Sequence, residues 1–207
     1  MMLTICCVSR NKSIYVTCLH MLLQLTVKCI QSGHQINIQF VNDASQLPKL
    51  MKSSERILWV EYGTSLDHES FDKIFEKTEI TVFPAVTEGI DWNAFKQKVE
   101  SGSKEPVSQM GLNFDTEVDR KISDGMYTVK RTVPSIWVMD CKSIISKIRE
   151  AKGDGIKLPY TIDEIFQKFV DKKVKIQAYT KCNVLKHYSY ECVGNILEAV
   201  GVSTKQG

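Results

Sequence analysis

Short apolar runs alternate with segments of helical periodicity along this chain, and this alternation limits the possible folds more than any other feature. The first apolar runs are LTICCV (3–8), INIQFV (36–41) and ILWV (57–60), each of strand length. Segment 14–30 between them has helical spacing, with Ser13 as a candidate N-cap, and residues 44–53 are expected to form a short helix or turn. Strands that alternate with helices predict an α/β sheet with helices on both faces, and the first three strands should be parallel.

The alternation continues through the second half, with one change of character. A helix is expected at 68–77 behind a capping Asp67, then a strand at 80–86 and a helical stripe from Trp92 to Val99. MYTVKRTV (126–133) and SIWVMD (135–140) predict two strands that meet at Pro134, so the sheet is expected to be mixed.

The last elements follow the same rule. A helix is expected at 141–150, and Thr161-x-x-Glu164 fits a capping box at the start of another. Strands at 173–179 and 183–188 and a helix at 190–200 complete the pattern. The chain, 1–207, is therefore predicted to be a single α/β domain with a mixed, mostly parallel central sheet flanked by helices.

Residues 101–125 form a long polar stretch with little periodicity, interrupted by Gly102, Pro106 and Gly111. A loop of this length inside a compact chain is usually functional or mobile. We expect a flexible loop that closes over a ligand, with Lys104, Arg120 and Lys121 approaching phosphates; the alternative is a disordered surface insertion.

Composition excludes several classes of protein. The net charge is +3, with 27 basic and 24 acidic residues, which is too balanced to predict nucleic-acid binding. The seven cysteines form no C-x-x-C pair, so a cysteine zinc site is not expected, and reduced, mostly buried thiols predict a cytoplasmic protein. Segment 14–30 resembles a signal anchor, but His20, Gln24 and Lys28 interrupt it, so a buried amphipathic helix and no membrane insertion are expected.

The chain lacks the motifs of several enzyme classes. Ser9-Arg10-Asn11-Lys12 stands after the first strand, where a dinucleotide-binding protein has G-x-G-x-x-G. G-x-x-x-x-G-K-S/T, H-E-x-x-H and G-x-S-x-G are also absent from the sequence.

Polar side chains instead follow each of the first three strands. Carboxyl ends of parallel strands share one edge of a sheet, so these groups can converge on one ligand. Arg10 could bind a phosphate, Asp43 a ribose or base, and Glu61 a divalent cation, whereas the alternative for each is a solvated loop residue. The set is Ser9, Arg10, Asn11, Asn42, Asp43 and Glu61.

This arrangement resembles the GT-A glycosyltransferases, whose corresponding strand commonly ends in D-x-D. The matching stretch is ILWVEYGTSLD, where Glu61-Tyr62-Gly63 takes the place of that motif and only Glu61 can supply a carboxylate. The motif is therefore degenerate. Across residues 3–190 the order of elements is similar to that of the family, and it is also similar to glycosyltransferase-like proteins of large DNA viruses.

Two later segments extend the resemblance. SIWVMDCKSIISKI (135–148) looks like a family strand and helix. TIDEIFQKFVDKKVKIQAYTKCNVLKH (161–187) looks like the late acidic segment, followed by a helix, a strand and a C-terminal histidine. The resemblance implies that Asp163 or Glu164 acts as the acceptor-side catalytic acid, and that His187 joins Glu61 in holding the metal. Glu164 could equally be the capping-box residue, and His187 a structural histidine.

The resemblance implies a nucleotide-binding half at 1–100 and an acceptor-side half at 101–200. It implies transfer of a sugar from a nucleotide-sugar, a UDP-sugar in the first place, to a glycan or protein acceptor, with Mn²⁺ or Mg²⁺ as cofactor. Two alternatives remain open, namely a catalytically inactive GT-A-like binding or structural domain and an unrelated α/β nucleotide-binding or protein-interaction domain.

Overall fold

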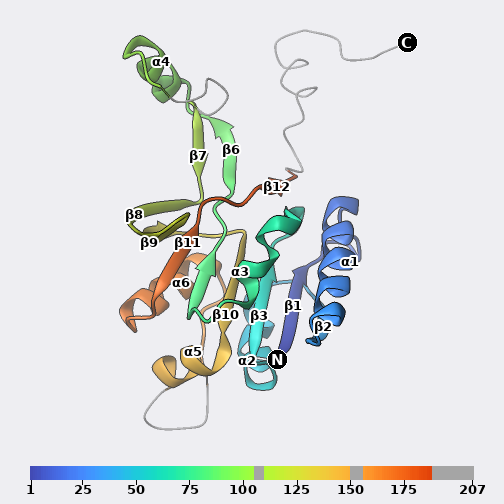
Figure 1. Cartoon of the computed structure of the whole chain (residues 1–207). Coiled ribbons are helices and arrows are strands. Elements are labelled where there is room, and N and C mark those ends of the chain that lie inside the picture. Colours follow the sequence, from blue (N-terminus) through green and yellow to red (C-terminus); the bar gives the residue numbers. More distant parts are fainter. Residues whose placement is uncertain (105–109, 150–155, 188–207) are drawn as a thin grey trace, which may run out of the picture.

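The fold is built on one eight-stranded sheet (Figure 1). The computed structural model describes residues 1–104, 110–149 and 156–187. The strands of the sheet are β1 (Met2–Val8), β2 (Gln35–Val41), β3 (Arg56–Val60), β5 (Ile80–Val82), β8 (Thr116–Ser123), β9 (Met126–Thr132), β10 (Ile136–Asp140) and β11 (Ile176–Tyr179). Their order is β2-β1-β3-β10-β5-β11-β9-β8, and only β10 and β9 run against the others. The predicted fold class, mixed α/β with a mostly parallel central sheet, is confirmed.

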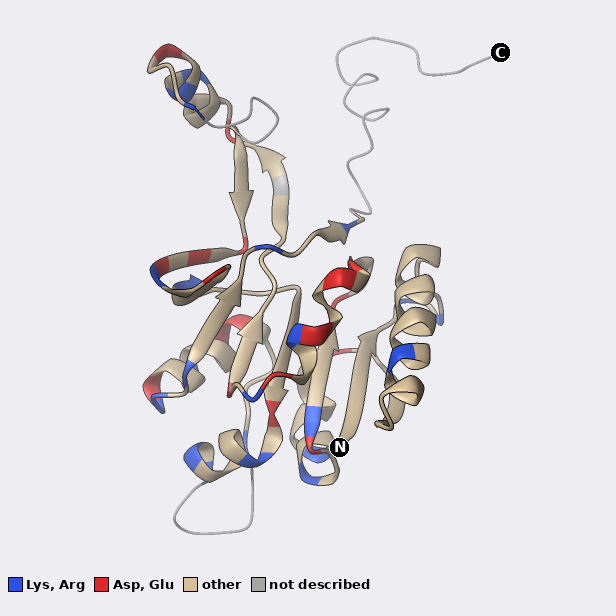
Figure 2. Cartoon of the chain, in the orientation of Figure 1, with Lys and Arg blue, Asp and Glu red and all other residues tan. Residues whose placement is uncertain are grey.

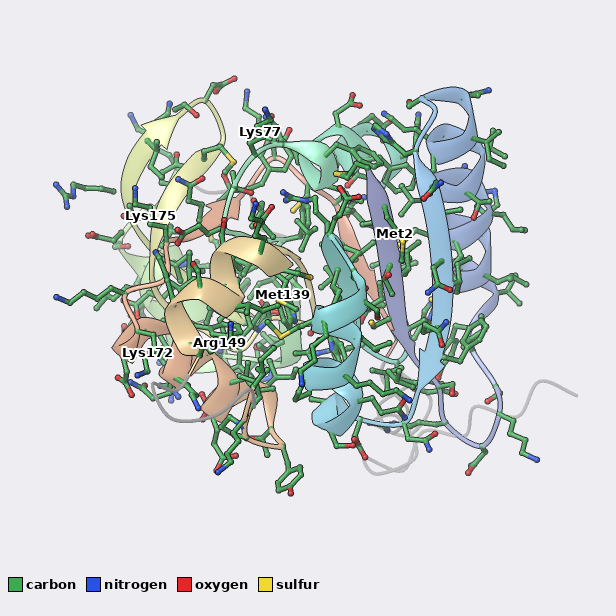
Figure 3. The ribbon with its side chains drawn as sticks, turned by 90° about the horizontal axis from the view of Figure 1, so that it is seen from below. Met2, Lys77, Met139, Arg149, Lys172 and Lys175 are labelled. Atoms are coloured by element: carbon green, nitrogen blue, oxygen red, sulfur yellow. The ribbon has the colours of Figure 1, made fainter. Side chains whose placement is uncertain are left out.

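Helices cover both faces of this sheet and enclose two apolar cores. They are α1 (Val16–Gln31), α2 (Leu47–Ser53), α3 (Phe71–Phe75), α4 (Trp92–Glu100), α5 (Cys141–Ile148) and α6 (Ile162–Asp171), with short 3-10 turns η1 (Ala44–Gln46) and η2 (His68–Ser70). One core lies under α2, α5 and α6, and the other under α1 and α3. Seen from the amino ends of the strands, α1 forms the outer layer beside β1 and β2 (Figure 3).

The centre of the sheet is buried on both faces because β3 and β10 lie between two layers of helices. Every residue of β3 is buried, which is what its unbroken apolar run predicts. Trp59 and Trp137 are stacked across the β3–β10 pair with ring centroids 6.4 Å apart, and Trp137 meets Phe166 of α6 edge-on at 5.0 Å. The tryptophans of the central strands therefore belong to the core.

The expected flexible loop at 101–125 is wrong for most of its described length. Residues Leu112–Phe114 (β7) pair with Val86–Ile90 (β6), and the following β8 is an edge strand of the main sheet. The β6–β7 ribbon carries α4 and projects from the sheet (Figure 1). Lys104 lies between α4 and β7, whereas Arg120 and Lys121 are exposed on β8.

Two helix boundaries also differ from the prediction. Ser13 does not cap α1, because its hydroxyl donates to the carbonyl oxygen of Arg10 and the N-cap is Tyr15. The helix expected at 68–77 is shorter, a 3-10 turn followed by α3, although Asp67 does cap it by accepting from the Ser70 amide. The helix expected at 190–200 lies outside the described residues.

Most of the cysteines are buried, as expected. The six cysteines of the described residues are free, and all but Cys182 are buried. Among the helices of the described segments, none has both the length and the apolar character needed to cross a lipid bilayer. A further short ribbon, Thr64–Leu66 (β4) with Val184–Lys186 (β12), brings the end of the described chain back to the residues that follow β3.

Candidate functional site

The carboxyl ends of β1, β2 and β3 lie side by side at one edge of the sheet. β1 pairs in parallel with β2 on one side and β3 on the other, and the Ser9 amide donates to the Val41 carbonyl at 2.9 Å. The expectation that the polar residues after these strands share one edge is confirmed. Those residues are Ser9, Arg10, Asn11, Asn42, Asp43 and Glu61.

The residues after β1 form a tight turn. Arg10 and Ser13 exchange both backbone hydrogen bonds, at 3.3 and 2.9 Å, and the two residues between them have positive φ angles, 52° for Asn11 and 59° for Lys12. A lysine rarely adopts this conformation, and strained backbone of this kind clusters at functional sites. The turn is exposed and presents two cations, Arg10 and Lys12, at the sheet edge. Sequence reasoning missed Lys12 as a site residue, although its place beside Arg10 after a strand was a usable signal.

Aromatic side chains pack against the turn that follows β1. The Arg10 guanidinium lies 5.2 Å from the centroid of the Tyr62 ring, within the range of a cation–π interaction. Tyr62 and Tyr15 are 5.2 Å apart between ring centroids. Tyr62 therefore couples the turn after β1 to the residues after β3, and no sequence motif marked this pairing.

Glu61 is half-buried at the start of the loop that follows β3. Its Oε1 accepts a hydrogen bond of 2.8 Å from the Trp59 indole, and its backbone amide donates to the Ser135 carbonyl at 2.8 Å. The carboxylate is thus fixed in direction by the core tryptophan two residues earlier. Oε2 has no hydrogen-bond partner among the described residues and is the atom available to a ligand.

His187 and Gly63 are packed against each other. The His187 amide donates to the Gly63 carbonyl at 2.8 Å, and its ring is stacked on Tyr15 at 4.6 Å, with 5° between the planes. The ring Nε2 is 3.0 Å from the Thr17 hydroxyl oxygen. The structure therefore brings His187 into the same loop cluster as Glu61, but its Nε2 would have to leave Thr17 before it could bind a metal.

Asp43 and Asn42 follow β2 and are exposed. Asp43 caps the η1 turn, since its Oδ1 accepts from the Ser45 amide at 2.8 Å. Hydrogen bonding from Ser45 holds the pKa of the Asp43 carboxyl below its usual value, so this group stays ionised in mildly acidic solution. It is an anchored acceptor beside the turn that follows β1.

Asp163 and Glu164 lie in the first turn of α6, and their described partners belong to α6 and the neighbouring strands. Glu164 donates its amide to the Thr161 hydroxyl, and its Oε2 accepts from that hydroxyl at 2.8 Å, so the predicted cap is confirmed. Asp163 lines a cavity of about 340 Å³ together with Lys130 and Arg131 of β9. The structure does not bring these acids into contact with Glu61.

We expect Thr161→Ala to lower the free energy of unfolding by about 1 kcal/mol, because the α6 N-cap hydroxyl is lost. Urea unfolding followed by circular dichroism measures this difference. The matched control is Thr180→Ala, a residue exposed at the end of β11, whose hydroxyl makes only a long bond of 3.3 Å. Equal stability of both variants would show that the capping hydroxyl contributes nothing.

A second group of polar residues at the same edge was not predicted. The Asp115 carboxylate accepts from the backbone amides of Ala85 and Ser135, at 3.1 and 3.0 Å, and from the Thr116 hydroxyl. The Lys186 ammonium donates to the Ser135 hydroxyl at 2.8 Å. Ser135 therefore connects Asp115 to Glu61, and the group lies where β5 and β8 meet the start of β10.

The described residues contain no group of three or more His, Cys, Asp and Glu side chains placed to hold a metal ion. The described residues at this edge therefore do not form a metal site made of protein side chains alone. Glu61 Oε2 fits a looser arrangement, because Mg²⁺ is commonly held by one or two carboxylates together with substrate phosphates and water.

The fold is shared with known structures. A197 from STIV matches with a TM-score of 0.52 and 11% identity, over 91% of this chain and 87% of that one. A putative glucose-1-phosphate thymidylyltransferase from Bacillus anthracis, in complex with a sucrose, matches with a TM-score of 0.50 and 10% identity, over 100% and 98%. At these identities the likeness shows the fold alone.

A glycosyltransferase involved in glycosylation of the major capsid of PBCV-1 matches with a TM-score of 0.38 and 10% identity, over 86% of this chain and 81% of that one, and this carries no argument. No family model matches the sequence, and no curated protein matches it.

Proposed function

We propose that this protein is a glycosyltransferase that takes a nucleotide-sugar, a UDP-sugar in the first place, and transfers the sugar to a glycan or protein acceptor. The observation that supports it best is the strained turn after β1, which presents Arg10 and Lys12 at the carboxyl edge of the sheet. Ligands of open α/β sheets bind at this edge. A solved structure with the same fold carries the name of a sugar nucleotidyltransferase, which agrees with a nucleotide-sugar ligand.

In this proposal the donor diphosphate lies on the turn. Arg10 and Lys12 compensate the negative charge that develops on the leaving diphosphate, and the Tyr62 ring limits the orientations open to Arg10. Asn11, Asn42 and the anchored Asp43 supply donors and acceptors for the ribose or base. Donor binding thus uses the ends of β1 and β2 together.

A divalent cation, Mn²⁺ or Mg²⁺, would be held by Glu61 Oε2 with the donor phosphates, and it would supply further charge compensation at the leaving group. His187 is the predicted second ligand, and its Nε2 would bind a metal only after release from Thr17. On the acceptor side, Asp163 or Glu164 would take the proton of the acceptor hydroxyl in an inverting reaction. Asp163 is the better placed of the two, because Glu164 is engaged in the cap of α6.

A thermal-shift screen tests the proposal most directly. We expect UDP and UDP-sugars to raise the melting temperature of the full chain, and a hydrolysis assay with and without Mn²⁺ to detect release of the sugar. The panel includes a nucleoside triphosphate with a sugar 1-phosphate, since turnover of that pair alone would indicate nucleotidyl transfer. Absence of both a shift by any nucleoside diphosphate and turnover of any nucleotide-sugar would refute the proposal.

Arg10→Ala is expected to weaken UDP binding about tenfold, because one charge-assisted contact to the diphosphate is lost. Calorimetric titration measures this change, and stability should remain within about 0.5 kcal/mol of the wild type, since the side chain is exposed. Arg120→Ala is the matched control, an exposed arginine on β8. The donor site lies elsewhere if both variants bind UDP as the wild type does.

The second candidate function is a catalytically inactive binding or structural domain of the same fold. It is favoured by the engagement of both predicted metal ligands, Glu61 with Trp59 and His187 with Thr17 and Tyr15. Binding of UDP without turnover of any nucleotide-sugar, and without an effect of Glu61→Ala on binding, would favour this function over the first.

A further inference from the structure

Helix α1 has two opposite apolar faces, and the described residues cover only one of them. Five residues, Cys18, Met21, Leu22, Leu25 and Cys29, are buried against the sheet. The opposite face carries a second stripe of aliphatic side chains that are exposed, here called the outer stripe: Val16, Leu19, Leu23, Val27 and Ile30. A helix that is apolar on both sides is normally covered on both, so we expect another molecule to pack against the outer stripe.

The outer stripe is long, uncharged and open. From Val16 to Ile30 it extends about 21 Å at the rise of an α-helix. Lys28 is the sole Lys, Arg, Asp or Glu of α1. It borders the cleft beside the stripe, where its ammonium is paired with Asp72 at 2.6 Å. The ribbon of α1 is accordingly almost free of charge colour, on the outer side of the sheet (Figure 2).

The spacing of the outer stripe is symmetric about its central residue. Val16 and Ile30 each lie seven residues from Leu23, and Leu19 and Val27 each lie four residues from it. When two copies of such a helix pair antiparallel about a twofold axis at Leu23, Val16 meets Ile30 and Leu19 meets Val27. Every aliphatic side chain of one copy then faces an aliphatic side chain of the other, and the lysines do not face each other.

We propose that the outer stripe of α1 is a self-association surface, at which a second copy of this chain pairs antiparallel about a twofold axis through Leu23. A twofold interface must be complementary to itself, and the symmetric stripe meets that condition. A cleft of about 570 Å³ opens along one side of the stripe and can take side chains of the partner. Leu23, Val27 and Phe71 line it together with polar residues that include His20, Gln24 and Lys28.

The surface is small for a protein interface. Two facing outer stripes bury roughly 1,000 Å² in total, in the range of weak, transient interfaces, so the dimer is expected to form and dissociate reversibly. Only the first residue of the outer stripe, Val16, lies near the candidate site, between Tyr15 and Thr17, which contact His187. The test of the surface does not depend on the proposed transferase activity.

Analytical ultracentrifugation of the full chain tests the pairing. The mass is expected to rise from 23.5 kDa towards twice that value as concentration increases. Leu23→Glu and Val27→Glu should shift the dissociation constant upwards at least tenfold. Val170→Glu on α6 is the matched control, because Val170 is 54% exposed and Val27 53%, and it should dimerise as the wild type does.

Disulfide trapping tests the register. With Leu23→Cys, oxidation by copper phenanthroline and dissolved oxygen should link two copies above the background of the wild type, because the new thiols meet at the axis. Leu19→Cys alone should not, since its two copies are about 12 Å apart along the helices. A mixture of Leu19→Cys and Val27→Cys should cross-link.

Three results would overturn the proposal. They are a monomer at all concentrations up to several hundred micromolar, a dimer that Leu23→Glu and Val27→Glu leave unchanged, and flotation of the wild type with phosphatidylcholine vesicles that Leu23→Glu abolishes. The last would show that a lipid surface covers the stripe. Thermal unfolding of each variant verifies that the exposed substitutions leave the fold intact.

Discussion

Asp115→Ala is expected to lower the free energy of unfolding by about 3 kcal/mol, because its carboxylate satisfies two buried backbone amides that have no other acceptor in this arrangement. These amides, of Ala85 and Ser135, lie where β5 ends and where β10 begins. Urea unfolding measures the difference. Asp119→Ala provides the control, since Asp119 lies on the exposed side of β8 and should change stability by less than about 0.5 kcal/mol.

The contribution of the Asp115 carboxyl to the stability of the fold is expected to depend on pH. Burial raises the pKa of Asp115, while the bonds from Ala85, Ser135 and Thr116 and the charge of Lys186 act in the opposite direction without cancelling it. A carboxyl whose pKa is higher in the folded chain stabilises the fold fully below its unfolded pKa of about 4, and that contribution is lost as pH rises through the folded pKa. The wild type should therefore lose stability relative to Asp115→Asn between pH 4 and pH 7. A difference that is constant over this range would contradict the prediction.

The first half of the fold could be predicted because its signals are local. The runs at 3–8, 36–41 and 57–60 are continuous and apolar, and they became β1, β2 and β3. Their parallel arrangement placed Arg10, Asp43 and Glu61 at one edge, which follows from strand direction alone.

The projecting ribbon and β8 could not be predicted, for a physical reason. Seven of the eight residues of β8 are exposed, so the strand has no buried face that would produce an alternating pattern. It is held by backbone pairing with β9 and by the hydrogen bond between Thr116 and Thr132. Such a strand carries the composition of a loop.

The site was predicted in part for a similar reason. Residues at strand ends can be found from sequence, whereas Tyr15, Thr17 and Lys186 acquire their roles through neighbours distant in the chain. Ser13 shows the opposite case, since its hydroxyl closes the turn after β1 instead of capping α1. The sequence around a residue indicates which hydrogen bonds its side chain can make, and the tertiary contacts decide which of these bonds form.

Gly63→Asp is expected to destabilise the protein by about 3 kcal/mol, although it restores the second acid of a D-x-D motif. Gly63 has a φ of +73°, and a β-carbon there would lie 2.9 Å from the His187 carbonyl oxygen and 3.2 Å from the Tyr15 ring. The backbone conformation alone costs about 1 kcal/mol for a residue with a β-carbon, and the close approach to backbone adds to it. An acid at this position would displace His187 and the end of β12 before it could meet a metal.

Gly33→Asp separates these two costs, because Gly33 has a φ of +68° but open space around its α-carbon. It should lose only about 1 kcal/mol. Thermal unfolding with and without Mn²⁺ gives both readouts, and we expect Gly63→Asp to show a lower melting temperature and no added stabilisation by the metal. A Gly63→Asp protein as stable as the wild type, with a new Mn²⁺-dependent shift, would show that the loop after β3 can still open into a two-acid site. The expected result would mean that the packing of Gly63 against His187 and Tyr15 has replaced that site, which leaves Glu61 as the one acid of the motif.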